Sequence, residues 1–326
     1  HKTFHKNEDG AAKSTVSFTL YAKEAQKQKR YLVNGILHVE WMPNRNELGY
    51  YPPHTLSIRN FEIMQRSGAP LFQNVGDLQI PPQQRGPILA YDLNKDGLTD
   101  FVLPSSNQIA WNSGSGLSTE RLSDEAAGNV RAALLGDFNG DGRVDLILEA
   151  TLIEKKETAA SSGLFLFAGD EQGKFDATPQ RIAVSPSIRA MGDTSLTSGD
   201  IDSDGDLDLW LSHYKEPYKG GSMPTPYYDS NDGYPSWLLI NDGTGLVFTE
   251  ETQQRGIATK QHRRAFSSSL FDYDNDHDLD LLVVSDFAGV DLYQNDGHGY
   301  YTDITSQAIP EKHLFGMGHS IGDFNK

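Results

Sequence analysis

The chain has 326 residues, of which 45 are acidic and 28 are basic, so its net charge is −17. It contains no cysteine, which excludes disulfides, thiolate chemistry and c-type haem attachment, and its negative charge disfavours a nucleic-acid partner. The hydrophobic fraction of 37% is enough for a substantial core. No apolar run is long enough for a transmembrane helix, so we expect no transmembrane segment.

Residues 1–85 contain three strand-like runs, at 15–21, 31–41 and 54–63, and the pairs Pro52-Pro53 and Pro81-Pro82 bound them. The segment carries no copy of the acidic repeat that follows it. We expect an N-terminal β segment that is either a degenerate first unit of that repeat or, as we favour, the end of an upstream β domain.

Four nine-residue segments after residue 85 share one acidic pattern, and a fifth begins at 323. Calcium takes about six to eight oxygen ligands, which short side chains at positions one, three, five and nine and a carbonyl at position seven can supply. A glycine at position six allows a sharp turn. The predicted ligands are Asp92, Asn94, Asp96, Leu98 and Asp100; Asp137, Asn139, Asp141, Arg143 and Asp145; Asp200, Asp202, Asp204, Asp206 and Asp208; Asp272, Asp274, Asp276, Asp278 and Asp280; and Asp323 and Asn325 in the incomplete copy.

Two other interpretations could explain acidic loops of this kind. An acidic turn without metal explains one Asp-Gly pair, but several carboxylates around one point repel each other unless a cation is present. A dockerin-type repeat leaves a similar loop on a helix, whereas the runs after these loops lack helical spacing. We therefore expect about four Ca²⁺ sites, with a fifth incomplete, on loops that join two strands. His277 replaces the glycine in the fourth loop, where we expect backbone strain.

A second signature follows each acidic loop, in which an apolar run ends in a glycine-rich turn, at 109–116, 164–175, 237–245 and 290–299. This pattern is typical of a β-hairpin. One unit then contains four antiparallel strands. The unit recurs at intervals of 45, 63, 72 and 51 residues, counted from Asp92 through Asp323. The sequence therefore predicts an all-β chain whose residues 86–326 form a β-propeller of four-stranded antiparallel blades.

The two signatures together resemble the FG-GAP, or VCBS, repeats of integrin α-subunit propellers and their bacterial relatives. The segments 271–284, 291–299 and 302–305 are most similar to the cartilage acidic protein group and its secreted bacterial homologues. The resemblance covers residues 86–326. It implies a seven-bladed propeller with calcium between the first two strands of a blade, a role in adhesion or recognition, and a secreted, periplasmic or cell-surface location.

Both ends of the chain look like breaks. It begins at His1 without a methionine and stops at Lys326 inside the fifth acidic motif. We expect the protein to continue past Lys326, so that the propeller is truncated at its C-terminus, and we expect a removed signal peptide to explain the missing start.

A partner surface is expected on the face opposite the acidic loops. If each loop joins the first two strands, the connection from the second strand to the third lies on the other face. In the third unit that connection, 213–236, carries several tyrosines, and a basic run at 260–264 shares its face. We expect a protein or glycan to bind there. The alternatives are tyrosines that only pack their own loop and a solvated basic loop. The candidates are Tyr214, Tyr227, Tyr228, Arg263 and Arg264.

The leading functional hypothesis is a secreted, calcium-binding propeller that acts as a non-catalytic recognition, adhesion or scaffold module. The first alternative is a polysaccharide lyase or sugar dehydratase, in which His213, Tyr227, Tyr228 or Lys260 would take the proton. The acidic loops are coordinatively closed, whereas a catalytic metal needs an open position, so we favour the non-enzymatic hypothesis. The second alternative is an accessory subunit of a larger extracytoplasmic complex.

Overall fold

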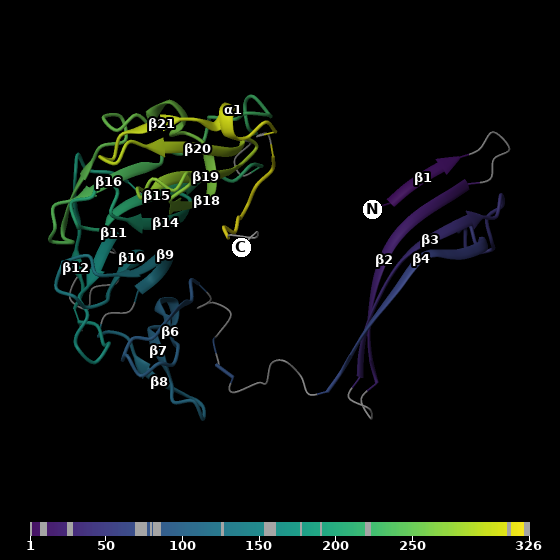
Figure 1. Ribbon diagram of the computed structural model, residues 1–326, viewed down its shortest axis with the longest axis horizontal. Helices are drawn as coiled ribbons and strands as arrows, with labels where there is room; N and C mark the ends of the chain where they lie inside the picture. Colours follow the sequence, from purple (N-terminus) through teal and green to yellow (C-terminus); the bar gives the residue numbers. More distant parts are fainter. Residues whose placement is uncertain are drawn as a thin grey trace. The chain divides into compact units, whose positions relative to one another are not determined.

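The computed structural model describes residues 2–6, 12–24, 29–68, 77–78, 80, 86–124, 127–152, 161–176, 178–189, 191–218, 223–311 and 314–322 (Figure 1). The chain divides into two compact units, His1–Asn74 and Val75–Lys326. Within the described ranges, no helix has the length and apolar character needed to cross a membrane.

The first unit is one antiparallel sheet whose four strands are adjacent in chain order: β1 (Lys2–Lys6), β2 (Ala12–Glu24), β3 (Lys29–Trp41) and β4 (Pro53–Ser67). The three predicted strand runs are confirmed as parts of β2, β3 and β4. Phe18 pairs with Gly35 across the sheet, where a Cβ atom would lie 2.9 Å from the Phe18 ring. Gly35 thus makes room for an aromatic side chain that covers it. Whether this unit is an upstream domain or a degenerate blade stays a prediction.

The second unit contains four antiparallel sheets, which we call blades one to four. Blade one comprises β5 (Leu89–Tyr91), β6 (Asp100–Leu103), β7 (Gln108–Asn112) and β8 (Leu117–Arg121); blade two comprises β9 (Ala127–Gly136), β10 (Asp145–Leu152), β11 (Ser161–Phe167) and β12 (Gln180–Arg181). Blade three comprises β14 (Asp193–Gly199), β15 (Asp208–Tyr214), β16 (Trp237–Asn241) and β17 (Val247–Glu250); blade four comprises β18 (Arg264–Phe271), β19 (Asp280–Asp286), β20 (Gly289–Asn295) and β21 (Tyr301–Asp303).

The connection between blades two and three adds β13 (Ala183–Ser185), which pairs in parallel with β17 at the outer edge of blade three. Three short helical turns complete the described elements: η3 (Pro104–Ser106), η5 (Ala258–Lys260) and α1 (Thr305–Ala308). The prediction of an all-β chain with four-stranded antiparallel sheets is confirmed.

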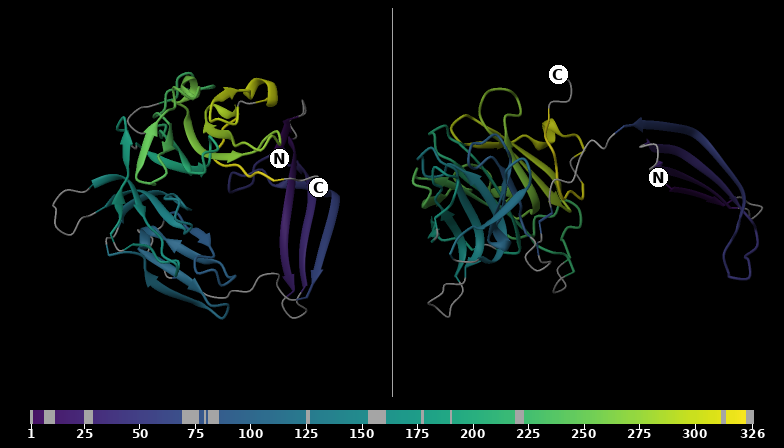
Figure 2. Two further views of the ribbon diagram at one scale, coloured as in Figure 1. Left: turned by 60° about the vertical axis from the view of Figure 1, so that its left-hand side comes forward. Right: turned by 90° about the horizontal axis from the view of Figure 1, so that it is seen from below.

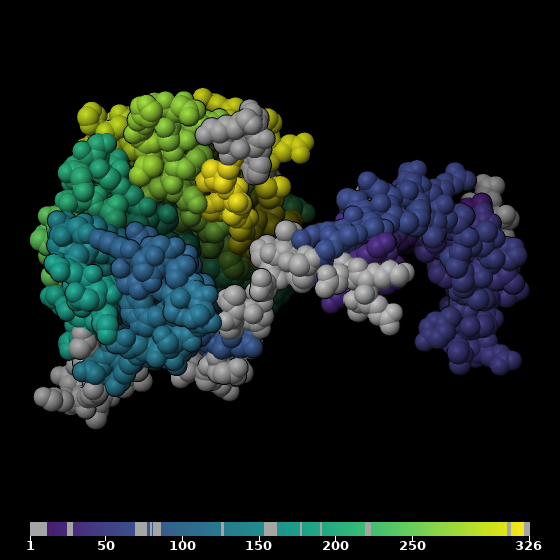
Figure 3. Space-filling view, turned by 60° about the horizontal axis from the view of Figure 1, so that its bottom comes forward, coloured from purple at the N-terminus to yellow at the C-terminus, as the bar shows by residue number. Residues whose placement is uncertain are grey.

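The blades lie side by side in chain order (Figures 1 and 2). Strand β14 contacts both β9 and β18, so the first strands of successive blades are neighbours, as a propeller requires. In the space-filling view, atoms of successive blades of this unit lie against one another on the face that is shown (Figure 3). Among the described residues this arrangement contains four blades, and the number of blades in the complete protein stays a prediction.

The core lies between neighbouring blades. Leu146 of β10 packs in the cluster shared with blade one, whereas the next residue, Ile147, packs in the cluster shared with blade three. Trp210 of β15 faces blade four in the same way. Because both faces of these second strands are covered, the strands are buried along almost their whole length. Their continuous apolar runs follow from this two-sided burial.

Candidate metal-binding loops and the opposite face

Each acidic loop joins the first and second strands of a blade, which confirms the prediction that the loops connect strands. The position-one aspartate directly follows the last residue of the first strand, and the position-nine aspartate is the first residue of the second strand. The position-nine side chains are fully buried at 0% exposure in all four blades: Asp100, Asp145, Asp208 and Asp280.

The position-one carboxylate organises the turn of each loop. In the first loop, Asp92 Oδ1 accepts a hydrogen bond of 3.0 Å from the Asp96 amide, and Asp92 Oδ2 accepts one of 2.9 Å from the Gly97 amide. The same pair of bonds recurs in the other three loops. The position-five carboxylate accepts a bond from the amide of position seven in every loop. The loops therefore share one backbone conformation.

Left-handed backbone occurs at position six in all four loops. The φ angles there are +85° for Gly97, +80° for Gly142, +96° for Gly205 and +76° for His277. Histidine has a Cβ atom, so this φ supports the expectation of strain in the fourth loop. The His277 side chain itself is 94% exposed.

Position four is also left-handed, a feature that the sequence reasoning missed. The φ angles are +59° for Lys95, +69° for Gly140, +63° for Ser203 and +64° for Asn275. The available signal was the glycine and the asparagine at this position in two of the four loops, since both residues tolerate positive φ.

The position-nine carboxylate makes contacts that the calcium pattern did not predict. In blade three, Asp208 Oδ2 accepts a bond of 3.1 Å from the amide of Ile201, and Oδ1 accepts one of 2.9 Å from the amide of Asn241, at the end of β16. Equivalent pairs are present in the other blades. The buried aspartate therefore ties the acidic loop to the third strand. Its role as a calcium ligand stays a prediction.

The side chains at positions one, three and five gather in the third and fourth loops. Carboxylate oxygens of Asp200, Asp202 and Asp204 lie within 4.8 Å of one another. The same holds for the fourth-loop side chains, Asp272, Asp274 and Asp276. In the first two loops an asparagine stands at position three, and its amide oxygen takes the place of one carboxylate. The third and fourth loops are thus the more strongly negative pair.

The electrostatics of these two loops favour a cation. Burial raises the pKa of Asp208 to about 7, with the nearby carboxylates of Asp202 and Asp204 adding to the effect. Burial and the neighbour Asp276 raise the pKa of Asp278 to about 6. Asp202 Oδ1 and Asp278 Oδ1 are buried and have no hydrogen-bond partner within the described ranges. Carboxylate oxygens without donors suit a hard divalent cation, so the residues fit calcium.

An asparagine at the end of the third strand links each of the last two blades to the blade before it. Asn241 Nδ2 donates a hydrogen bond of 2.9 Å to the carbonyl of Phe138, in the second acidic loop. Asn295 Nδ2 donates one of 2.8 Å to the carbonyl of Ile201, in the third. The sequence analysis did not predict these links, although the recurrence of asparagine at the same place in both hairpins was a visible signal.

Glycines in the second hairpin of a blade also lie against the acidic loop of the blade before it. A Cβ atom at Gly173 would lie 2.4 Å from the Leu93 carbonyl oxygen, and one at Gly245 would lie 2.8 Å from the Phe138 carbonyl oxygen. A side chain at either position would push the neighbouring blade away. The acidic loop therefore takes part in the contact between blades.

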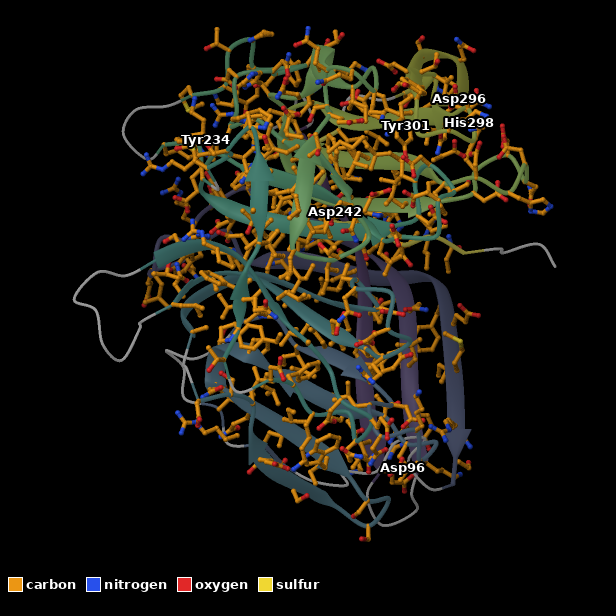
Figure 4. All side chains as sticks on the ribbon, turned by 90° about the vertical axis from the view of Figure 1, so that its left-hand side faces the viewer. Asp96, Tyr234, Asp242, Asp296, His298 and Tyr301 are labelled. Atoms are coloured by element: carbon orange, nitrogen blue, oxygen red, sulfur yellow. The ribbon has the colours of Figure 1, made fainter. Side chains whose placement is uncertain are left out.

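The opposite face carries an aromatic cluster formed by Tyr227, Tyr228, Phe287 and Phe315. The ring centroids of Tyr227 and Tyr228 are 5.2 Å apart, and that of Tyr227 lies 5.4 Å from Phe287 and 5.8 Å from Phe315. Tyr228 is 64% exposed and Tyr227 is 43% exposed. In Figure 4, Tyr234 of the same connection lies at the left of the view, whereas Asp296 and His298, in a hairpin on the side of the acidic loops, lie at the right.

Three of the five predicted partner-binding side chains lie in the interior, so the expectation that they are exposed is wrong. Arg264 is fully buried and pairs with Asp232 at 2.9 Å. Arg263 pairs with Asp291 at 3.1 Å and with Asp229 at 2.6 Å. These internal carboxylates already pair with both guanidinium groups. The two arginines therefore belong neither to a solvated loop nor to an exposed site for an anionic partner.

Tyr214, the third of these side chains, is 8% exposed, and its hydroxyl donates a hydrogen bond of 3.1 Å to Asp286. Its ring packs against Phe266, with centroids 4.0 Å apart. Tyr214 therefore packs the interior of its own region, which was one of the alternatives stated above.

Two of the candidate proton acceptors are also held inside the fold. His213 is fully buried, its Nδ1 lies 2.5 Å from the carbonyl oxygen of Pro235, and burial lowers its pKa to about 4. The Lys260 ammonium lies 2.6 Å from carboxylates of both Asp291 and Asp303. Neither side chain is presented to a substrate. The predicted ligands Asp323 and Asn325 lie outside the described residues.

These features define an all-β repeat protein in which each four-stranded blade carries an acidic loop between its first two strands. Comparison with known families agrees: residues 92–148 and 272–326 match the FG-GAP-like repeat. Over 154 residues, or 47% of its length, this chain is 26% identical to integrin alpha-3 of Mus musculus and 25% identical to integrin alpha-3 of Cricetulus griseus. These findings support an FG-GAP, integrin α-like repeat protein.

The extent of these similarities is limited. The matched region spans 14% of the length of each integrin alpha-3. Among solved structures, a pore of the Photorhabdus luminescens Tc holotoxin carrying the mutation TccC3-D651A is 14% identical, with 90% of this chain and 14% of that chain covered. Its TM-score of 0.34 is too low to carry an argument.

Proposed function

We propose that the chain is a calcium-stabilised recognition module that works outside the cell and binds a partner protein through the face opposite its acidic loops. The FG-GAP-like repeats and the likeness to integrin alpha-3 support a propeller-type recognition or adhesion module. Calcium, secretion and the particular surface are the parts that we add.

The observation that carries the calcium proposal is the set of buried carboxylate oxygens without donors. Asp202 Oδ1 and Asp278 Oδ1 lie in loops that also contain clustered carboxylates at positions one, three and five. Asp202 pairs with Arg255 at 3.0 Å through its other oxygen, Oδ2, but the remaining clustered carboxylates are unfavourable in the ionised form unless a further cation compensates them. Side chains at positions one, three, five and nine and the carbonyl at position seven would hold calcium, whose charge would offset part of the negative charge of each loop.

Calcium binding is tested by isothermal titration of chelator-treated protein with CaCl₂ and, separately, with MgCl₂. We expect saturable calcium binding at about four sites and weaker magnesium binding, because loops with many oxygen ligands suit the larger ion. Absence of saturable calcium binding would exclude the metal-dependent part of the proposal.

The aromatic cluster is the surface that we assign to the partner. Exposed tyrosines anchor protein interfaces well, because they bury a large area and lose little conformational freedom. The pairs Arg264–Asp232 and Arg263–Asp229 fix the connection that carries Tyr227 and Tyr228. Tyr227 and Tyr228 are therefore the two contact residues that an experiment has to change, and the ion pairs hold the connection that carries them.

Arrays of extracellular proteins and of glycans, probed in calcium with the wild-type chain and the Tyr227→Ala, Tyr228→Ala double variant, test this assignment. We expect a protein target whose binding is lost in the double variant while the calcium-dependent melting temperature is unchanged. Tyr50→Ala, at an exposed tyrosine of the first unit, serves as the control. Binding only to glycans, or binding that the double variant retains, would reject the proposed partner surface.

A further inference from the structure

The sheet of the first unit has one apolar face and one mainly polar face. Residues that pair directly across an antiparallel sheet lie on the same face, so the strand register assigns each side chain. Two apolar rows cross β2, β3 and β4 on one face, which we call the apolar face: Val16, Leu37 and Ile58 form the first row, and Leu20, Val33 and Ile63 form the second. The other face carries polar pairs such as Thr19 with Asn34.

The centre of the apolar face is also made of apolar side chains. A Cβ atom at Gly35 would lie 2.9 Å from the Phe18 ring and 3.3 Å from Ile58 Cγ2, so these two side chains lie over the glycine. Near one end of the face, Trp41 Nε1 donates a hydrogen bond of 2.5 Å to Ser14 Oγ. Because these polar groups satisfy each other, that end of the face can be buried without losing a hydrogen bond to water.

The apolar face has no second layer among the described elements of its unit, because all four strands belong to this one sheet (Figure 1). Leu20, Leu56, Ile58 and Ile63 are between 53% and 58% exposed. A sheet that is apolar on one face buries that face against another layer in a stable domain. Exposed apolar surface of this extent therefore indicates a contact surface.

The free edge of β4 suits a partner less well than the apolar face does. Arg59, Glu62 and Arg66 place charges along this strand, and Asn60 interrupts the pairing with a left-handed φ of +50°. Pro53, the first residue of the strand, has no amide hydrogen to donate. Charges, bulges and prolines protect an edge strand against pairing with another chain.

We propose that the apolar face binds the same face of a second copy of this chain, so that two sheets form a β-sandwich. At about 3.3 Å per residue and about 4.8 Å between strands, β2, β3 and β4 cover roughly 45 Å by 14 Å, or about 650 Å² of flat area per copy. The relief of the side chains adds to this area. A stable interface of standard size buries about 800 Å² per partner, so the face has the area that a dimer needs.

The distribution of charge favours a second copy of the chain as the partner. Neither apolar row contains a charged residue, so two copies of the face meet without like-charge repulsion. Residues 1–74 hold ten basic and six acidic residues, so the strong negative charge of the chain lies in its other unit. A contact between first units leaves these acidic units out of the interface. This inference does not depend on the proposed calcium sites or on the aromatic cluster.

The full chain in calcium is tested by sedimentation equilibrium at increasing protein concentration and by the reactivity of single thiols. The chain contains no cysteine, so Leu56→Cys and Ser57→Cys each introduce one thiol, on the apolar and on the polar face. We expect an equilibrium between monomer and dimer. The thiol of Leu56→Cys should become protected in proportion to the dimer fraction, whereas the thiol of Ser57→Cys should stay reactive.

The Leu56→Lys, Ile58→Lys double variant should raise the dissociation constant of the dimer at least about a hundredfold, because charges buried without partners oppose association. The matched control is Thr55→Lys, Ser57→Lys, which adds the same charge to the opposite face of the same strand and should stay within about threefold. All four positions are exposed in the unit, so the sheet should form in both variants. Unchanged far-UV circular dichroism checks this.

Three results would overturn the proposal. The first is a chain that stays monomeric at all concentrations while the thiol of Leu56→Cys stays reactive. The second is a monomer in which that thiol is protected, which would show that another part of the same chain covers the face. The third is a dimer that the Leu56→Lys, Ile58→Lys variant retains or in which the thiol of Leu56→Cys stays reactive, since the contact would then lie elsewhere.

Discussion

The side-chain amide of Asn295 donates a 2.8 Å hydrogen bond to the carbonyl of Ile201, in the acidic loop of the preceding blade. The backbone amide of Asn295 also binds Asp280 Oδ1, and its side-chain oxygen accepts a bond from the Gly299 amide. One buried asparagine thus joins its own aspartate, its own hairpin and the neighbouring loop. Asn241 makes the equivalent contacts with Asp208, Gly245 and Phe138. Order in one loop therefore supports the packing of the next blade.

Replacing Asn295 by alanine should lower the free energy of unfolding by about 2–4 kcal/mol, because several buried backbone groups lose their partners. Urea unfolding in calcium measures the change. Asn112→Ala is the control, since the Asn112 side chain is partly buried and its amide donates to the carbonyl of Thr99 in its own blade rather than to the blade before it. An equal loss in both variants would contradict the proposed role of Asn295 between blades.

Asp204→Asn should remove or weaken one calcium site without preventing folding. It deletes one of the three clustered carboxylates of the third loop but keeps a side-chain oxygen that can accept the Asp206 amide. Calorimetry should show one site fewer, or one site at least about tenfold weaker, as expected for the loss of a charged ligand. Asp170→Asn, in a hairpin of blade two, should leave the calcium titration unchanged. Unaltered binding in Asp204→Asn would remove this residue from the ligand set.

His277→Gly should stabilise the fourth loop by about 0.5–1 kcal/mol, because glycine adopts the observed φ of +76° without strain. The reciprocal change, Gly205→His, should destabilise the third loop by a similar amount. No atom lies within 4 Å of a Cβ placed at Gly205, so that effect would come from the backbone alone. Thermal unfolding of both variants at saturating calcium measures the shifts, and shifts of the same sign would contradict the strain interpretation.

His213 should make stability depend on pH between about 6.5 and 4. Its pKa is lowered to about 4 in the folded chain by burial, so below about pH 6.5 the unfolded chain binds the proton more readily. This histidine therefore lowers the free energy of unfolding as pH falls through that window, by up to roughly 3 kcal/mol.

The histidine effect is isolated by comparing the pH dependence of unfolding for His213→Gln and the wild-type chain. We expect a shallower decline with falling pH in the variant. His262→Gln, at an exposed histidine, should keep the wild-type slope. Parallel curves for His213→Gln and the wild-type chain would show that His213 does not control this dependence.

Much of the blade architecture could be predicted because local pattern and tertiary role coincide there. The acidic loop marks the end of one strand and the start of the next, and the glycine-rich turn marks the second hairpin. The position-nine aspartates were located correctly, but their bonds to residues such as Asn241 depend on a third strand that is remote in sequence. No local pattern reports such a contact.

The opposite face was less predictable because burial there depends on long-range charge pairing. From the sequence alone, Arg264 is expected at the surface. In the structure it is buried because Asp232, in the preceding connection, lies 2.9 Å from its guanidinium group.

The most direct test of the account is the melting temperature of the chain in calcium and after exhaustive treatment with EDTA, with magnesium as the control ion. We predict a fall of more than about 10 °C on calcium removal and recovery when calcium is restored, because each bound ion stabilises the folded state by mass action. Magnesium should restore stability only partly. An unchanged melting temperature in EDTA would contradict the claim that calcium holds the acidic loops and, through them, the blades.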